Sequence, residues 1–302
     1  MASREVLRRQ VRSTETLRSV VGTMKALASV RIGQVRRADR ALEASEATLE
    51  RAFQVLAQRE PGLARALAVA AGTPAVGSGA WGAVLFGSDH GLCGPFNERL
   101  ARRAAARLVQ LGSEEAPPRL LVVGRRLRPK LAALGHPVER VVALPASVAA
   151  AGDAVLEVAQ VIEGWQREHG VAQVFVVHHQ PVSGVGYRTR TVQLLPLDVA
   201  WLRELAERPW PTQQLPMLGL EAEAMLRGLA RQHVAHVLVR AFAASQAAEN
   251  AARLAAMEAA ERNVDERLAE LRHAAAQERQ NAVTEELLDV QAAFRASDAG
   301  VL

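Results

Sequence analysis

Residues 17–56, LRSVVGTMKALASVRIGQVRRADRALEASEATLERAFQVL, decide the fold of this 302-residue chain. Steps of four and three residues alternate along this stretch, and ten of the twelve positions that they reach are apolar. These positions, which we call the N-terminal seam, are Leu17, Val21, Met24, Ala28, Arg31, Val35, Ala38, Leu42, Ser45, Leu49, Ala52 and Leu56. A period of about 3.5 residues sustained over this length is typical of a coiled coil. Because no proline occurs between Ala2 and Glu60, the pattern predicts one long helix over residues 1–60.

The other end of the chain predicts a second long helix, over residues 217–297. No proline follows Pro216, and no glycine occurs between Leu229 and Ala299. At about 1.5 Å per residue such a helix reaches roughly 100 Å, far beyond an ordinary globular helix. Its seam, which changes phase after Ala259 and after Ala275, consists of Leu238, Ala241, Ser245, Ala248, Ala252, Ala255, Ala259, Val264, Leu268, Leu271, Ala275, Val283, Leu287, Val290 and Phe294. The many alanines allow a partner helix to approach closely.

The charges of the two ends are complementary. Residues 1–60 carry 12 basic and 7 acidic side chains, whereas residues 221–302 carry 9 basic and 13 acidic ones. Opposite net charges favour pairing of the two helices. A folded insertion between them favours an antiparallel arrangement, in which the chain leaves along one helix and returns along the other. We therefore expect the two ends of the chain to form one coiled coil.

Strand and helix patterns alternate between the two long helices. Apolar runs predict strands at AWGAVLF (80–86), RLLVVG (119–124) and VAQVFVVHH (171–179). Amphipathic stretches predict helices at 96–111, 126–135 and 148–169. YRTRTVQLLPL (187–197) alternates apolar and polar residues and predicts an edge strand. This alternation is typical of βαβ units.

The expected fold class is therefore α+β or α/β. It combines a long antiparallel coiled coil, made from residues 1–60 and 217–297, with an inserted Rossmann-like α/β domain over residues 78–200. Linkers rich in glycine and proline, or in proline alone, are expected at residues 61–79 and 207–216.

Composition excludes several kinds of site. Cys93 is the single cysteine, so an intramolecular disulfide and a cysteine-based zinc site are both excluded. The N-terminal MASREVLRRQVRS leads into no apolar run of a signal peptide. Residues 66–87 are uncharged, but Pro74 and five glycines argue against a membrane-spanning helix. The net charge of +5 suits a polyanionic partner, yet nearly all of the basic residues are arginines, as in proteins from GC-rich genomes.

FGSDHGLCGPFN (86–97) has the composition of a chemical site. Cys93, with Asp89 and His90 beside it, offers a nucleophile with an acid and an imidazole. Members of a catalytic triad normally come from distant segments, however, and the glycine of a nucleophile elbow is missing. Neither G-x-G-x-x-G nor G-x-x-x-x-G-K-[ST] occurs, so a phosphate-binding loop is not indicated either. We favour a structural turn between a strand and a helix.

Two further groups of residues can be interpreted either as functional sites or as ordinary structural features. His178 and His179 end a predicted strand and could bind a metal, but no third ligand is visible at a suitable spacing. A solvent-exposed sheet edge is the favoured interpretation for this pair. The arginines at 4, 8, 9 and 12 and at 31, 36, 37 and 40 could bind nucleic acid, but they are spread along the helix rather than clustered before the heptads. A solvated or protein-facing helix surface is favoured for them.

SDHGLCGPFN (88–97) resembles the S-D-R-G-L-C-G-G-x-N signature of the gamma subunit of F-type ATP synthases. TETLRSVVGTMKALASVRIGQVRRA (14–38) is similar to the first helix of that family, and YRTRTVQLLPL to its strand ending in Q-x-L-P-L. ASQAAENAARLAAMEAAERNV (244–264) and RQNAVTEELLDV (279–290) resemble two motifs of its C-terminal helix. His90 stands where the family has arginine, Pro95 where it has glycine, and Gly22-Thr23 where it has Lys-Ala, which indicates a divergent branch.

The resemblance implies a central-stalk rotor, which couples ion movement through the c-ring to ATP synthesis or hydrolysis in a ring of alpha and beta subunits. It implies alpha, beta, epsilon and c-ring partners, and a peripheral position on the cytoplasmic face of the bacterial inner membrane. No catalytic residue of its own, no metal, no cofactor and no nucleic-acid partner are implied.

Six residues match family positions that contact partners. Met24 and Lys25 match the neck region, close to the acidic loops of beta. Arg253, Gln280, Thr284 and Glu286 match positions on the C-terminal helix that contact the surrounding ring. Met24 is also a seam residue, and an ion pair with Glu249 explains Arg253 equally well. Two other classes of protein stay open: a basic coiled-coil nucleic-acid-binding protein, and a small α/β enzyme with helical oligomerisation arms.

Overall fold

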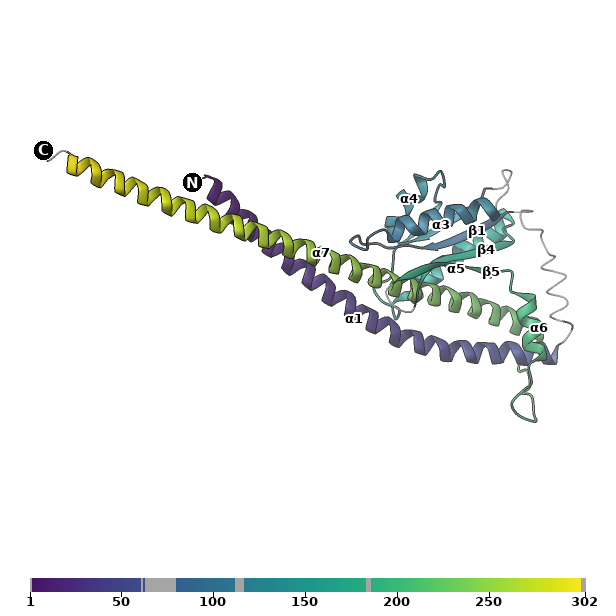
Figure 1. Ribbon diagram of the computed structural model, residues 1–302. Helices are drawn as coiled ribbons and strands as arrows, with labels where there is room; N and C mark the ends of the chain where they lie inside the picture. Colours follow the sequence, from purple (N-terminus) through teal and green to yellow (C-terminus); the bar gives the residue numbers. More distant parts are fainter. Residues whose placement is uncertain (1, 61, 63–79, 112–116, 183–185, 300–302) are drawn as a thin grey trace. The chain divides into compact units, whose positions relative to one another are not determined.

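The computed structural model describes residues 2–60, 62, 80–111, 117–182 and 186–299 (Figure 1). Its two terminal helices are α1 (Ala2–Arg59) and α7 (Ala222–Ala299), close to the predicted helices 1–60 and 217–297. Most of the predicted linker 61–79 lies outside the described residues. Contacts group the chain into two units, of which one combines Met1–Ala28 with Leu254–Leu302 and the other spans Ser29–Arg253. We call them the coil unit and the sheet unit. The domain boundaries inferred from sequence remain predictions.

A five-stranded sheet, in the order β3-β2-β1-β4-β5, forms the centre of the sheet unit. Its strands are β1 (Trp81–Phe86), β2 (Arg119–Val123), β3 (Arg140–Val142), β4 (Gln173–Pro181) and β5 (Tyr187–Leu195). The first four pair in parallel, and β5 lies antiparallel to β4 at the edge, where an edge strand is predicted. The three-residue strand β3 is not predicted, because it is too short to show a period.

Helices cover both faces of this sheet (Figure 1). On one face, α3 (Phe96–Leu111) and α4 (Arg128–Ala132) enclose a core that includes Leu85, Leu100 and Leu131. On the other face, α5 (Ala151–His169) and part of α7 enclose a second core with Trp165 and Phe242. The sheet therefore has the buried parallel centre of a three-layer α/β domain.

Close backbone contact joins the loops that follow β1 and β2. Gly124 has a φ of 104°, and a Cβ atom there would lie 2.8 Å from backbone atoms of Gly87 and Ser88. The Gly87 amide also donates to the Val123 carbonyl at 2.8 Å. Gly124 is therefore required both by its left-handed backbone and by the space available.

A short helix, α6 (Val199–Glu207), closes the end of the sheet unit and is not predicted from the sequence. Asp198 caps it by accepting hydrogen bonds from the amides of Ala200 and Trp201. Leu202 and Leu205 of α6 pack with Phe53 and Leu56 of α1. The Gln54 and Gln58 side chains of α1 both donate to the Arg208 carbonyl, at 2.8 and 2.7 Å, so hydrogen bonds also fix this end.

Ion pairs between the terminal helices demonstrate the predicted antiparallel pairing within the coil unit. Glu15 pairs with Arg272, Arg18 with Asp265 and Lys25 with Glu261, at N···O distances of 2.7, 2.7 and 2.8 Å. Residue numbers rise along α1 as they fall along α7. In the sheet unit Glu46 pairs with Arg240, which continues the same order. The complementary charges of the two ends thus meet as expected.

The N-terminal seam is only partly correct. Its positions seven residues apart, from Val21 to Leu56, are buried or half-buried, but Leu17, Arg31 and Ser45 are exposed. Phe53 is more buried than a strict alternation of three and four allows, because α1 there packs against both α6 and α7. Figure 1 shows α7 continuing past the N-terminal end of α1. The predicted seam residues Leu287 and Val290 are accordingly exposed, and the side chain of Phe294 lies outside the described residues.

Candidate functional site

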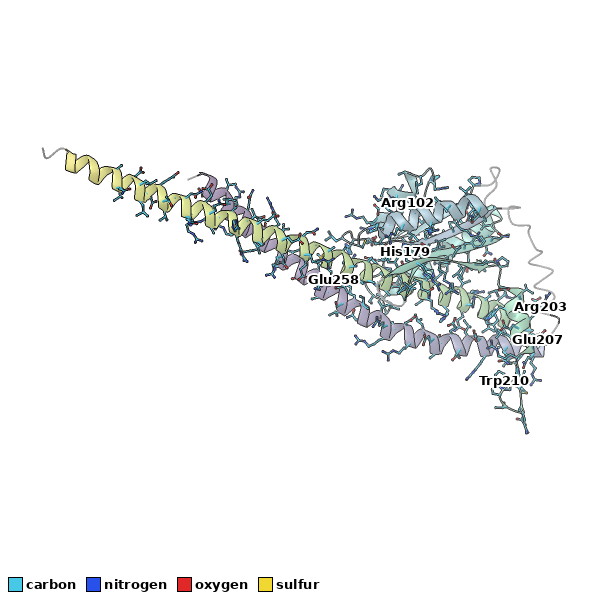
Figure 2. All side chains as sticks on the ribbon, in the orientation of Figure 1. Arg102, His179, Arg203, Glu207, Trp210 and Glu258 are labelled. Carbon is cyan, nitrogen blue, oxygen red and sulfur yellow. The ribbon has the colours of Figure 1, made fainter. Side chains whose placement is uncertain are left out.

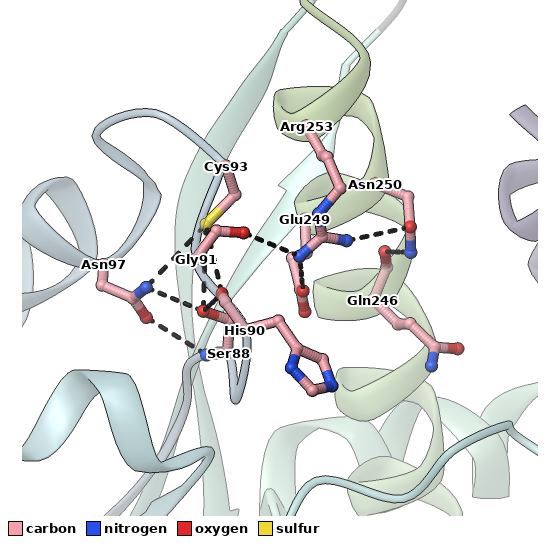
Figure 3. Close-up of polar contacts among 9 residues, drawn as sticks. All are labelled: Ser88, His90, Gly91, Cys93, Asn97, Gln246, Glu249, Asn250 and Arg253. Carbon is pink, nitrogen blue, oxygen red and sulfur yellow. Dashed lines mark hydrogen bonds and ion pairs between the residues drawn. The ribbon is translucent and has the colours of Figure 1, made fainter. Parts of the chain in front are cut away.

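The loop from Gly87 to Asn97, between β1 and α3, is held by its own side chains (Figure 3). Asn97 accepts a hydrogen bond from the Ser88 amide at 3.1 Å and donates to Ser88 Oγ at 2.8 Å. Ser88 Oγ in turn donates to the His90 carbonyl at 2.9 Å. Leu92, whose φ is 63°, is the one non-glycine residue with positive φ in the described part of the chain. The loop is therefore a tightly specified turn, as favoured from the sequence.

The surroundings of Cys93 and Asp89 differ from those that a catalytic cysteine site requires. Cys93 is 2% exposed, and burial raises the pKa of its thiol, which disfavours the thiolate that a nucleophile requires. The Asp89 carboxylate accepts hydrogen bonds from the amides of Arg125 and Leu144, at 2.7 and 2.9 Å. Asp89 thus joins three loops and gives no support to a catalytic role for Cys93.

A buried polar cluster lies on α7, and its Arg253 side chain reaches this loop (Figure 3). Its members, which are all buried, are Ser245, Gln246, Glu249, Asn250 and Arg253. Arg253 Nη2 donates to Glu249 Oε1 at 2.5 Å and to the Gly91 carbonyl at 3.4 Å. Burial raises the pKa of the Glu249 carboxyl, and the adjacent Arg253 charge opposes that shift. The predicted Glu249–Arg253 ion pair is therefore present, and it also contacts the loop.

The interpretation of His178 and His179 as an exposed sheet edge is wrong. The pair lies within β4, covered on both sides by other elements, and the two side chains are 5% and 1% exposed. His179 Nε2 lies 3.1 Å from the Phe96 carbonyl, and its Nδ1 lies 3.2 Å from Thr189 Oγ1 (Figure 2 labels His179 on the sheet). Because a carbonyl only accepts, Nε2 carries the proton and Thr189 donates to Nδ1. Burial lowers the pKa of each histidine to about 4.

The structure divides the six predicted contact residues into two groups. Gln280, Thr284 and Glu286 are exposed on α7, and Met24 and Lys25 are half-buried on α1. Lys25 donates to Glu261 at 2.8 Å, and this bond raises the pKa of Lys25 and lowers that of Glu261. Arg253, in contrast, is 7% exposed and contacts groups of its own chain.

Of the polar partners of Arg253, Glu249 was predicted, whereas Asn250 and the Gly91 carbonyl were not. Gln246, Glu249, Asn250 and Arg253 recur at spacings of three and four residues inside an alanine-rich stretch. That spacing places them on one face of a helix, so it signals a polar face that needs partners. The contact of Arg253 with the loop after β1 was not foreseeable, because Gly91 is distant in sequence.

Two further kinds of feature are absent from the described residues. No helix there is both long and apolar enough to span a membrane. Nor does any cluster of three or more histidine, cysteine, aspartate or glutamate side chains in that part of the chain have the arrangement of a metal site, so His178 and His179 lack further ligands.

Comparison with known proteins gives a consistent result along the whole chain. Three bacterial proteins named ATP synthase gamma chain match it at low identity. The protein of Desulforamulus reducens is 26% identical over 96% of this chain and 97% of its own length. The proteins of Nocardioides sp. and Thermobifida fusca are each 28% identical, over 94% and 96% of this chain and 92% and 94% of their own lengths.

Solved structures share the fold. A chain of the Euglena gracilis mitochondrial ATP synthase rotor superposes with a TM-score of 0.64 at 14% identity, covering 93% of this chain and 99% of its own. A chain of the Tetrahymena thermophila central stalk and c-ring structure gives a TM-score of 0.53 at 18% identity, covering 80% of this chain. The family model described as ATP synthase matches residues 3–296. Because that match includes both long helices and the sheet between them, the chain belongs to the gamma-chain family of ATP synthases.

Proposed function

We propose that this gamma chain is the central-stalk rotor of an F-type ATP synthase. It couples ion translocation through the c-ring to ATP synthesis or hydrolysis in the ring of alpha and beta subunits. The observation that carries the proposal is the family match across residues 3–296, which includes the antiparallel pair of terminal helices. Its partners would be the alpha, beta and epsilon subunits and the c-ring, at the cytoplasmic face of a bacterial inner membrane.

The coupling mechanism requires a stiff body with an uneven surface. Paired helices provide the stiffness in the coil unit, where ion pairs join α1 to α7. The exposed end of α7 provides the unevenness, because apolar Leu287 and Leu288 lie there between acidic Glu286 and Asp289. As such a rotor turns, each beta subunit meets a different surface in turn. Different contact free energies then bias each subunit between open and closed states, which changes its affinity for nucleotide.

The chain itself would supply no catalytic group to this reaction. Its residues would position the rotor and contact partner subunits, whereas the ring of alpha and beta subunits would carry out the nucleotide chemistry. On the rotor, we propose that Gln280, Thr284 and Glu286 contact the ring, since all three are exposed. Met24 and Lys25 would contribute near the neck, partly through the Lys25–Glu261 pair. The further role of Arg253 is argued below.

Co-expression with the alpha and beta subunits of the same operon tests the proposal. We expect the chain to co-elute with them in size-exclusion chromatography and to raise ATP hydrolysis above that of alpha and beta alone. Failure to co-elute with subunits that assemble normally would contradict the rotor function. Two controls address the other classes: salt-dependent nucleic-acid binding by the isolated chain, and turnover by the isolated chain.

A further inference from the structure

The segment after β1 is fixed to helix α7 at three places. Ser245 Oγ donates to the Phe86 carbonyl, at the end of β1, at 2.9 Å. Arg253 Nη2 donates to the Gly91 carbonyl at 3.4 Å. Between these two bonds, Ala248 and Ala252 pack with Cys93 and Phe96. We call these four α7 residues, together with Glu249, the ion-pair partner of Arg253, the α7 joint.

Small side chains bring the helix close to the loop at the joint. Ala248 and Phe96 are both fully buried, and Tyr187 of β5 covers the same cluster. Because alanine adds only one carbon beyond the backbone, two turns of α7 can lie against the loop without a layer of long side chains between them. The polar groups at the two ends of the joint then fix the position of the helix along the loop.

Arg253 has a fixed direction in this joint. Its Nη2 donates to Glu249 Oε1 at 2.5 Å, and its Nη1 donates to Asn250 Oδ1 at 3.2 Å. The side chains of Arg253 and Glu249 are 8% and 4% exposed. Buried ion pairs often stabilise a fold no more than apolar residues of the same size do. The guanidinium is held in one orientation instead, with Nη2 directed to the Gly91 carbonyl.

We propose that the α7 joint transmits torque between the α/β sheet and helix α7, with Arg253 as its positioning residue. This inference rests on the proposed rotor function. Apolar contacts between α7 and the sheet, such as those of Leu238 and Phe242, are non-directional and permit sliding. Hydrogen bonds to two backbone carbonyls, at Phe86 and Gly91, resist both translation and rotation of the helix against the sheet. A ring contact for Arg253 is disfavoured, because only 7% of the residue is exposed.

Coupled ion pumping by the assembled complex tests the joint. The variant Glu249→Gln/Arg253→Met removes both charges and the bond to Gly91 without leaving one charge buried alone. In vesicles containing the complete complex, we expect the number of ions pumped per ATP to fall about fivefold, and hydrolysis to fall less. The matched control Arg267→Gln/Glu270→Gln removes an exposed ion pair within α7 of the coil unit and should keep the wild-type ratio. An equal ratio in the joint variant and the wild type would overturn the proposal.

A disulfide bond between the loop and α7 tests whether coupling can be restored in the neutral variant. Adding Ala252→Cys to the neutral variant places a second thiol at the cluster of Cys93, Phe96 and Ala248, against which Ala252 packs. Oxidation should restore the pumping ratio, and a reductant should abolish it again. Amide exchange over residues 88–94 should be faster in the unlinked neutral variant than in the wild type, which reports the loosened loop independently of assembly. A linked variant that still pumps poorly, or unchanged loop exchange, would refute the joint. A wild-type complex that fails to assemble would instead refute the rotor function.

Discussion

Helix α7 contains two arginine–glutamate ion pairs in opposite environments. In residues 245–253 the Glu249–Arg253 pair is buried, with side-chain exposures of 4% and 8%. In the coil unit, the Arg267–Glu270 pair on the same helix is exposed, at 61% and 65%. Both pairs are short-range pairs along one helix, so sequence spacing does not distinguish them. The difference teaches that the surroundings decide what a charge pair on this helix does. The buried Glu249–Arg253 pair positions a loop, whereas the Arg267–Glu270 pair stays in solvent.

The comparison predicts first that core leucines and exposed leucines differ most in their effect on stability. Leu121→Ala removes a side chain that is 0% exposed at the centre of the sheet, and we expect a loss of about 4 kcal/mol in the free energy of unfolding. Leu287→Ala, at 65% exposure, should cost less than about 0.5 kcal/mol. Urea unfolding followed by tryptophan fluorescence measures both. Similar losses in the two variants would contradict the burial assigned to them.

The second prediction separates the buried ion pair from an exposed one. Arg253→Met leaves the Glu249 carboxylate buried without its partner, and we expect a loss of about 3 kcal/mol. Arg18→Met breaks the pair with Asp265, whose side chains are 55% and 45% exposed, and should cost about 0.3 kcal/mol. Adding Glu249→Gln to Arg253→Met should recover most of the first loss. No recovery in the double variant would show that packing, and not the unpaired charge, dominates.

The third prediction concerns pH and the buried histidines of β4. The pKa values of His178 and His179 fall to about 4 in the fold, below the ordinary 6.5. Between these pH values the unfolded chain binds more protons than the native chain, so stability decreases as the pH falls from 6.5 towards 4. We expect a loss of about 3 kcal/mol for each histidine across this window. Melting temperatures measured through the window should fall less steeply for His179→Gln, which can still donate to the Phe96 carbonyl; parallel curves would contradict the assignment.

The smallest effect on stability is expected at the exposed end of α7. Glu286→Ala should leave the melting temperature unchanged, because the side chain is exposed. In the assembled complex, ATP hydrolysis should fall about twofold if this residue contacts the ring. Glu223→Ala, at an exposed position in the first turn of α7, is the matched control and should leave hydrolysis unchanged. Equal hydrolysis by the two variants would remove Glu286 from the proposed contact surface.

Much of the fold could be predicted from local patterns. Heptad spacing predicts the long helices α1 and α7, and alternating apolar runs predict β1, β2, β4 and the edge strand β5. These predictions succeed because helix and strand periods are properties of consecutive residues. The three-residue strand β3 and the short helix α6 were missed, since neither is long enough to show a period.

The candidate site was less predictable. The turn at residues 88–97 could be recognised from its glycines and its family motif, and its structural role agrees with the hydrogen bonds of Ser88 and Asn97. The bond between Arg253 and the Gly91 carbonyl joins residues 162 positions apart. No local pattern indicates such a contact, and the exposed-edge interpretation of His178 and His179 failed for the same reason.

The sequence by itself therefore determined most of the elements, their order and the antiparallel pairing of the ends, because periodicity and opposite charge are encoded in neighbouring residues and in whole segments. Only the tertiary structure decided which polar groups are buried. Segments that are remote in sequence, namely α3, β5 and the loop after β1, cover four such residues: Glu249, Arg253, His178 and His179. The physical reason is that desolvation depends on every segment that covers a group, whereas secondary structure depends mainly on the residues beside it.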